Sequence, residues 1–351
     1  MTRAAGRPER RGHRRPNGRP EQRPEGGPEQ RPVERRRGRL RRTLLAGLVA
    51  AAVVLPVSAA ASPDVPAPAP AAVAEGAALP DRYGANRANL AEAAAMAREA
   101  GRTGRAAKLE AMGAAGTARF LAFDGRGRGR AVEVLGDLES ADRIAVLVPG
   151  SDTTLDTYQR FRAGALALQQ RLLAGHPRSA VVAWLGYDTP GTVSPTVLSA
   201  DRADAAAAEL GPFLDRLGRT AAPGARLSLL CHSYGSVVCA RTATGPAVTD
   251  MALFGSPGTG AGSASELPTG ARVWAGRGRA DWIGRVPHVR LGGLGFGTDP
   301  VDPAFGARPF TAGPGGHSDY LKPGTASLDS LARIVLGTTP AVPTAPEVPH
   351  A

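Results

Sequence analysis

Residues 225–239 read Ala-Arg-Leu-Ser-Leu-Leu-Cys-His-Ser-Tyr-Gly-Ser-Val-Val-Cys, and they carry the strongest signal for the fold. A strand-like apolar run ends at Ser233 and a run of small residues follows it, which predicts a strand, a sharp turn and a helix. The turn fits the pattern G-x-S-x-G, in which a serine hydroxyl is exposed at the carboxyl edge of a parallel sheet. Gly235 fits the pattern, whereas Cys231 stands where glycine is usual. Ser233 is therefore the candidate nucleophile, and the alternative is an ordinary tight turn.

Apolar runs and helix-like runs alternate on both sides of this stretch. Strands are predicted over residues 143–149, 180–185, 226–230, 251–254 and 272–275. Helices are predicted over residues 155–173, 201–217, 236–242 and 327–336. Repeated strand–helix units of this kind predict an α/β fold with a doubly wound, mostly parallel sheet. Upstream of them, residues 119–123 and 131–135 alternate with a period of two around a glycine turn and predict a β-hairpin.

Two alanine-rich runs before the hairpin, residues 81–100 and 105–112, have helical spacing. We assign residues 80–115 to N-terminal helices of a folded domain that spans residues 80–337. Residues 256–270 alone separate two of the predicted strands, which is too short for a helical cap over the site. We therefore expect residues 282–307 and the N-terminal helices to border the pocket mouth.

The segments outside this domain predict an exported protein. Residues 1–42 are rich in Arg and Pro with almost nothing apolar, so we expect a disordered, cytoplasmic tail. Residues 43–61 are uncharged and end in small residues, which is typical of a signal peptide, and they are also long enough to be a membrane anchor. Residues 62–79 predict a Pro/Ala linker, and residues 338–351 a loose tail. We expect the domain to be secreted or anchored to the outer face of the cytoplasmic membrane.

The charge and the cysteine count exclude several classes of protein. The net charge is +12, but the first 42 residues carry fifteen Arg and five Glu, so the remaining chain is nearly neutral. Nucleic-acid-binding domains cluster Lys and Arg on their own surface, and we therefore expect no nucleic-acid partner. With only Cys231 and Cys239 present, we expect no disulfide framework and interpret both as buried small residues. No metal-ligand spacing or phosphate loop occurs, so we expect no metal and no cofactor.

A serine nucleophile needs a base to accept its proton and a carboxylate to orient that base. When the serine lies in a turn of this kind, the partners follow it in the order acid, then histidine. His317 lies in a glycine-rich loop before the last predicted helix and is the candidate base, whereas His288 is embedded in apolar sequence. Asp281 follows the penultimate predicted strand and is the candidate acid, with Asp299 and Asp302 as alternatives.

The oxyanion of an acyl-transfer reaction needs two converging backbone N–H groups. We expect one from Tyr234, which follows the nucleophile, and one from Ser151, in the loop after an earlier strand. Asp152 lies beside Ser151, and its carboxylate would oppose an oxyanion. We therefore expect the Asp152 side chain to turn away from the site.

From about Asp81 to Gly337 the chain resembles a group of high-GC bacterial α/β-hydrolase-fold proteins of unknown function. The motifs that carry the resemblance are Asp81-Arg-x-x-Ala-Asn-Arg-x-x-Leu90, Val148-Pro-Gly150, Val182-Ala-Trp-Leu-Gly-Tyr-Asp-Thr-Pro190, His232-Ser-Tyr-Gly235, Gly255-Ser-Pro-Gly258, Phe296-Gly-Thr-Asp-Pro300 and His317-Ser-Asp-Tyr320. The resemblance implies an α/β-hydrolase fold and a Ser233–His317 pair, but it implies no substrate. In the motif that spans residues 182–190, Trp184, Tyr187 and Asp188 either line the pocket or pack at its rim.

These observations favour an exported serine hydrolase that cleaves a carboxylic ester, or less readily an amide, through an acyl-enzyme on Ser233. We expect a small-molecule or lipid-like ester as substrate, and contact with the membrane through residues 43–61 if that segment is retained. The alternative is a catalytically silent α/β-hydrolase-fold protein that binds a partner or lipid at the cell envelope. A third hypothesis is a surface-anchored interaction protein whose basic tail contacts anionic lipid.

Overall fold

One sheet of eight strands organises the part of the chain that the computed structural model describes, residues 65–74, 76–114, 118–289 and 295–338. The strands are β1 (Arg119–Asp124), β2 (Arg130–Leu135), β3 (Arg143–Val148), β4 (Ser179–Leu185), β5 (Arg226–His232), β6 (Val248–Phe254), β7 (Arg272–Gly276) and β8 (Arg308–Pro309). Their spatial order is β1-β2-β4-β3-β5-β6-β7-β8. Strand β2 runs antiparallel to both of its neighbours, and every other pair is parallel. This is the predicted α/β-hydrolase fold.

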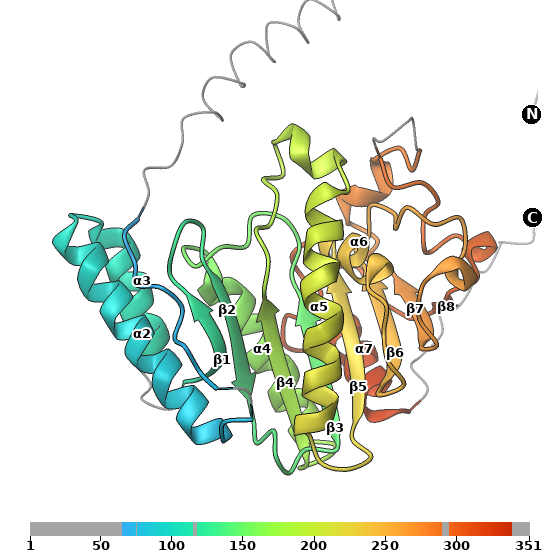
Figure 1. Ribbon diagram of the computed structural model, residues 1–351. Coiled ribbons are helices and arrows are strands. Elements are labelled where there is room, and N and C mark those ends of the chain that lie inside the picture. Colours follow the sequence, from blue (N-terminus) through green and yellow to red (C-terminus); the bar gives the residue numbers. More distant parts are fainter. Residues whose placement is uncertain (1–64, 75, 115–117, 290–294, 339–351) are drawn as a thin grey trace, which may run out of the picture. The chain divides into compact units, whose positions relative to one another are not determined.

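Helices cover both faces of this sheet (Figure 1). Helices α4 (Tyr158–Leu173) and α7 (Ala326–Leu336) pack on one face, and α5 (Asp201–Thr220) and α6 (Tyr234–Arg241) pack on the other. Strands covered on both faces bury every side chain, and for that reason they read as continuous apolar runs rather than alternating ones. All seven residues of β4, for example, are buried.

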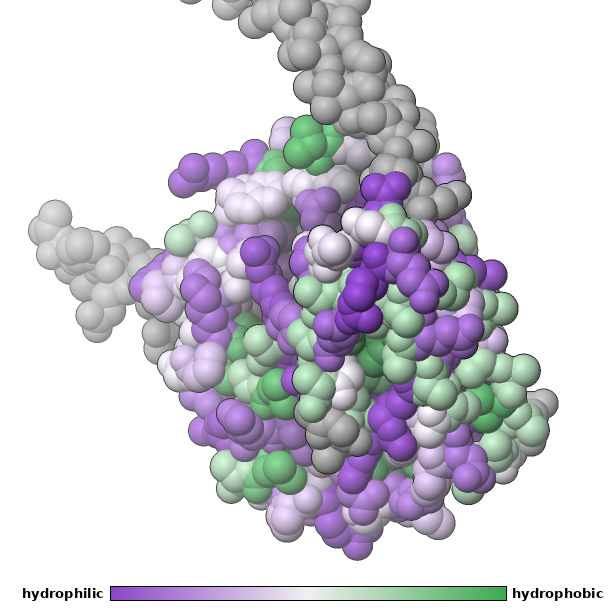
Figure 2. Space-filling model, turned by 90° about the vertical axis from the view of Figure 1, so that its left-hand side faces the viewer, coloured by the Kyte–Doolittle hydropathy of each residue, from purple (hydrophilic) through white to green (hydrophobic). Residues whose placement is uncertain are grey.

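Two helices, α2 (Leu79–Glu99) and α3 (Thr103–Gly113), lie at the β1 edge of the sheet, close to their predicted positions (Figure 1). They bury small and apolar side chains against each other and against β1, among them Leu90, Ala93, Leu109 and Met112. Seen from this side, hydrophilic and weakly apolar residues are interspersed over the outer surface (Figure 2). The alanine-rich sequence therefore serves close helix packing.

The described part of the predicted linker is held against α2. The Asn89 side-chain amide donates to the carbonyl of Ala69 (2.6 Å), and Arg82 donates to the carbonyl of Ala74 (3.3 Å). Residues 1–42 and 43–61, predicted as tail and as signal or anchor, lie outside the described residues. Among the described helices, none is long and apolar enough to cross a membrane.

The connections at the carboxyl edge of the sheet are short. Between β6 and β7 the only regular element is the 3-10 turn η2 (Ala264–Glu266), so the absence of a helical cap at this position is confirmed. Between β7 and α7 lie η3 (Trp282–Arg285), η4 (Pro303–Phe305) and β8, which the sequence did not predict. Strand β8 has only two residues, too few for a period of two to be recognised.

The two cysteines form a disulfide, so the expectation of two separate buried residues was wrong. Cys231 is the penultimate residue of β5 and Cys239 lies on α6, with 6.4 Å between their Cα atoms. Two cysteines eight residues apart within a single strand or helix would be too distant from each other to form a disulfide. Here the turn at Ser233 folds the helix back onto the strand, and the bond joins the two elements on either side of the candidate nucleophile.

We predict that the double variant Cys231→Ala/Cys239→Ala has a free energy of unfolding about 2–3 kcal/mol below that of the wild type, because a cross-link of this loop length restricts the unfolded chain. Urea unfolding of both proteins measures the difference. Wild-type protein treated with reductant after unfolding is the matched control. Two titratable thiols in unreduced, unfolded wild-type protein would contradict the bond itself.

Candidate active site

Ser233 occupies the turn between β5 and α6 with φ 53° and ψ −126°. Non-glycine residues rarely adopt a positive φ, and among the described non-glycine residues only Asp152 shares this feature with Ser233. The surroundings of Ser233 are tightly packed: a Cβ on Gly235 would lie 2.6 Å from the carbonyl oxygen of Pro149, and a Cβ on Gly150 would lie 2.6 Å from the Cβ of Ser233. Glycine at these two positions lets α6 and the loop after β3 meet around the serine.

Three predicted residues meet at this turn. The Nε2 atom of His317 lies 2.9 Å from the Oγ atom of Ser233. The Nδ1 atom of the same ring lies 2.8 Å and 3.0 Å from the two carboxylate oxygens of Asp281. A neutral imidazole whose Nδ1 donates to a carboxylate presents Nε2 as the acceptor for the serine proton. The alternative acid Asp299 is instead paired with Arg277.

Asp281 is buried, yet its surroundings favour the charged form. Burial is the strongest influence and raises the pKa of Asp281, but hydrogen bonds from His317, Tyr320 and the backbone N–H of Ile283 outweigh it, so the pKa lies below its usual value. The Tyr320 hydroxyl donates at 2.5 Å, and the Ile283 N–H donates at 2.9 Å. The carboxylate is therefore fixed in place as an anion facing His317.

Tyr320 is a site residue that the sequence reasoning did not assign. Its hydroxyl accepts from the Gly278 N–H (3.0 Å) while it donates to Asp281. Burial raises the pKa of the Tyr320 phenol well above its ordinary value, so it remains a donor. The available signal was its position three residues after His317 in a shared motif.

His232 supports the backbone of the candidate base. Its Nε2 atom lies 2.8 Å from the carbonyl oxygen of His317, and since a carbonyl only accepts, that nitrogen carries the proton. The ring contacts those of Phe254, His317 and Tyr320. Burial, and after it the nearby His317, lowers the pKa of His232 to about 3, so the ring remains neutral. His232 precedes Ser233 in the sequence, so the order of acid and histidine after the serine does not select it, and this positioning contact was missed.

We predict that His232 makes the protein sensitive to acid. The folded-state pKa of about 3 lies below the ordinary value of 6.5, so between these values the unfolded chain binds a proton that the folded chain does not. The free energy of unfolding should therefore fall as the pH is lowered through this interval. Urea unfolding at a series of pH values should show a shallower fall in His232→Gln than in the wild type.

The matched control for that measurement is His176→Gln, because His176 lies beyond α4 and bonds to Asp142 rather than to the site. If His232→Gln and the wild type lost stability with the same slope, His232 would not be the group responsible.

Tyr234 and Ser151 border the serine from its two sides. Tyr234 is the first residue of α6, so its N–H has no acceptor inside the helix. Ser151 follows Gly150, which lies against Ser233. The Asp152 carboxylate accepts from the N–H of Thr192 (3.1 Å), on the segment after β4.

The structure contradicts a pocket-lining role for Trp184 and Tyr187. Both are buried in the core under α5, and their rings stack on each other with centroids 5.9 Å apart. The Tyr187 hydroxyl donates to the carbonyl of Pro149 (2.7 Å). Asp188 is exposed and lies 3.6 Å from Arg130, so it faces β2. Trp184 belongs to β4, and Tyr187 and Asp188 follow the last residue of that strand. Strand β3 lies between β4 and β5, the strand that leads to Ser233.

Trp282 is the large apolar side chain beside the catalytic edge. It is 45% exposed, and its ring centroid lies 4.8 Å from that of His317. The segment after β7, which the sequence placed at the pocket mouth, thus contacts the candidate base. Within the described residues, no cluster of three or more His, Cys, Asp or Glu is arranged to hold a metal ion.

Comparison with known proteins agrees with this fold. A family model described as alpha/beta hydrolase matches residues 124–291. An uncharacterized protein of Mycobacterium tuberculosis is 31% identical over 253 residues, which cover 60% of this chain and 37% of the relative. An uncharacterized protein of Mycobacterium bovis is 34% identical over 150 residues, which cover 38% of this chain and 54% of the relative. The matched regions thus span only 37% and 54% of these relatives' lengths.

The solved structures that are similar to this chain include two bacterial hydrolases. The α/β serine hydrolase XC6422 from Xanthomonas campestris, described as lacking a lid, has a TM-score of 0.39 and 19% identity and covers 61% of this chain and 92% of its own. The esterase LipW from Mycobacterium marinum has a TM-score of 0.41 and 16% identity and covers 70% of this chain and 90% of its own. The family model and the mycobacterial relatives confirm the resemblance to α/β-hydrolase-fold proteins of high-GC bacteria whose function is unknown.

Proposed function

We propose that this α/β-hydrolase-fold protein is a serine hydrolase that cleaves a carboxylic ester through an acyl-enzyme on Ser233. One observation carries the proposal: a continuous line of hydrogen bonds runs from Ser233 Oγ to His317 Nε2 (2.9 Å) and from His317 Nδ1 to Asp281 (2.8 Å). A serine so placed can transfer its proton as it attacks, and the carboxylate stabilises the imidazolium that forms. An ordinary tight turn needs neither partner.

In the first half-reaction, Ser233 Oγ bonds to the carbonyl carbon of the ester while His317 Nε2 takes the hydroxyl proton. The oxygen of the tetrahedral intermediate would accept hydrogen bonds from the N–H groups of Tyr234 and Ser151. His317 then gives its proton to the departing oxygen, the C–O bond breaks, and the alcohol leaves. In the second half-reaction, water attacks the acyl-enzyme by the same route and releases the acid.

An ester is favoured over an amide because an alcohol leaves a tetrahedral intermediate more readily than an amine. The proposed substrate is a small-molecule or lipid-like ester. The half-exposed indole of Trp282 beside His317 supports an apolar group next to the reacting carbonyl. A short connection between β6 and β7 leaves this side of the site without a helical cap.

A fluorophosphonate probe tests the proposal without knowledge of the substrate, because it labels only a serine whose base and oxyanion donors are assembled. We predict labelling on Ser233, located by mass spectrometry of the digested protein. Labelling should be lost in Ser233→Ala and His317→Ala. Asp281→Asn should slow it by about 10⁴-fold, as expected when the base loses its orienting carboxylate.

Asp299→Asn is the matched control, since Asp299 is a half-buried carboxylate that also follows β7 but pairs with Arg277. It should label at the wild-type rate. Folded wild-type protein that stays unlabelled, while a known serine hydrolase in the same tube reacts, would exclude the enzyme and favour a catalytically silent binding protein of the cell envelope.

We also propose that the domain is exported. Residues 43–61 form an uncharged run directly after a cluster of arginines. The Cys231–Cys239 disulfide supports the same compartment, because disulfides persist in oxidising surroundings and are rare in the cytosol.

Fractionation of the native host should find the domain outside the cytoplasm. Amino-terminal sequencing should then show a start near Ser62 if the protein is secreted, or residues 43–61 retained if it is anchored. The physical reason is that an apolar run flanked by arginines inserts with the arginines inside. A full-length cytosolic protein with two free thiols would contradict export.

A further inference from the structure

We propose that Arg105 of α3 is a positioning residue for the loop that carries Ser151, and therefore that the N-terminal helices are part of the catalytic unit. This inference rests on the proposed acyl-enzyme chemistry. Helix α3 lies outside residues 124–291, the span that the family model matches. The contacts described below join it to the edge of the site.

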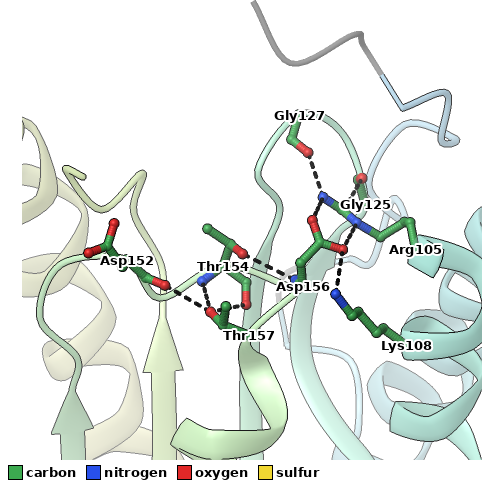
Figure 3. Close-up of polar contacts among 8 residues, drawn as sticks. All are labelled: Arg105, Lys108, Gly125, Gly127, Asp152, Thr154, Asp156 and Thr157. Carbon is green, nitrogen blue, oxygen red and sulfur yellow. Dashed lines mark hydrogen bonds and ion pairs between the residues drawn. The ribbon is translucent and has the colours of Figure 1, made fainter. Parts of the chain in front are cut away.

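The Arg105 side chain is only 5% exposed, and each of its three guanidinium nitrogens donates at least one hydrogen bond. Its Nε and Nη2 atoms donate to the two carboxylate oxygens of Asp156, at 2.9 Å and 3.1 Å (Figure 3). Its Nη1 and Nη2 atoms also donate to the carbonyls of Gly125 (3.3 Å) and Gly127 (3.0 Å) in the β1–β2 turn. A planar fork of donors that meets a carboxylate in two places fixes its orientation, which a single charge does not.

Asp156 belongs to a loop whose own hydrogen bonds lead back toward the serine. The Asp156 N–H donates to Thr154 Oγ1 (3.1 Å), and the Thr154 N–H donates to Thr157 Oγ1 (2.9 Å). The Thr157 hydroxyl in turn donates to the carbonyl of Asp152 (2.9 Å), as the dashed lines in Figure 3 show. Asp152 is bonded directly to Ser151. A series of hydrogen bonds thus connects the contact between Arg105 and Asp156 to Asp152, the residue that follows Ser151.

The other end of the loop is sensitive to small displacements. Asp152 has a φ of 59°, and its N–H donates to the carbonyl of Pro190 (3.0 Å). Gly150 lies so close to Ser233 that an added Cβ would be 3.1 Å from the serine Oγ. A shift in the loop would therefore turn the Ser151 N–H relative to the reacting oxygen, while Ser233, His317 and Asp281 belong to other segments.

The β1–β2 turn shares the same anchor. The Leu155 N–H donates to the carbonyl of Arg128 (3.1 Å), and the Leu155 side chain is buried against Gly129. Arg105 therefore contacts both the β1–β2 turn and the loop that carries Ser151. A purely structural role would stabilise the protein without changing the reaction, so the two roles can be separated by kinetics.

The decisive variants are Arg105→Lys, which keeps the charge but loses the fork, and Asp156→Asn, which keeps the shape of the acceptor but loses its charge. The reactions measured are fluorophosphonate labelling and the hydrolysis of a p-nitrophenyl acyl ester by the full chain. We expect each variant to lose at least about tenfold in labelling rate and in kcat, with KM changed less than twofold, because misplacing one oxyanion donor weakens transition-state binding alone. Urea unfolding confirms that each variant is folded under assay conditions.

Arg98→Lys is the matched control, because Arg98 is an exposed arginine of α2 whose ion pair is with Glu110 of α3 and not with the loop that carries Ser151. It should react as the wild type does. The double variant Arg105→Lys/Asp156→Asn should be no slower than the slower single variant, since both changes break one contact. If Arg105→Lys does not fold, Asp156→Asn reports on the same contact from a partly exposed side chain.

Wild-type rates in folded Arg105→Lys and Asp156→Asn would overturn the positioning role and leave the proposed function intact. A rise in KM with unchanged kcat would also overturn it. Wild-type protein that neither labels nor hydrolyses the ester would overturn both the proposed function and this inference.

Discussion

The left-handed turn at Ser233 is the constraint on which the rest of the site depends. A serine at φ 53° can be held there only if the strand before it and the helix after it are both fixed. Two glycines allow the close approach, since a side chain at Gly150 or Gly235 would collide with backbone or with the serine. The Cys231–Cys239 bond joins the same strand and helix from within the core. Packing, covalent bonding and small residues thus act on one turn.

Two buried charged side chains near the site, Asp281 and Arg105, are each compensated by several hydrogen-bond partners. The Asp281 carboxylate faces His317, Tyr320 and a backbone N–H, which together outweigh the cost of burial and hold its pKa down. The buried guanidinium of Arg105 faces a carboxylate and two carbonyls. A buried group with a full set of partners is rigid as well as stable, because any rotation breaks several bonds at once. Rigid partners are what a preformed site needs.

At the amino edge of the sheet, the start of strand β6 differs from the sequence-based prediction. The strand predicted over residues 251–254 begins after Asp250, whereas Asp250 lies within β6, fully buried between Arg272 and the indole of Trp274. A charged residue interrupts an apolar run, so the predicted strand began after it. The buried charge of Asp250 is compensated by Arg272, its partner on the neighbouring strand β7. Asp250 lies toward the amino end of β6, at the edge of the sheet opposite to the one that carries Ser233.

The sequence by itself determined the alternation of strands and helices, the turn at Ser233 and the choice of His317 and Asp281, because periodicity and chain order are local or one-dimensional properties. The disulfide, the Tyr320 and His232 contacts and the burial of Trp184 were decided by the tertiary structure alone. Each depends on which strand lies next to which: β3 separates β4 from β5 and keeps Trp184 in the core, while the loops after β5, β7 and β8 share one edge. The spacing of residues in the sequence does not encode which strands are neighbours. Ser233 and His317 are 84 positions apart, and they come into contact only when the sheet has formed.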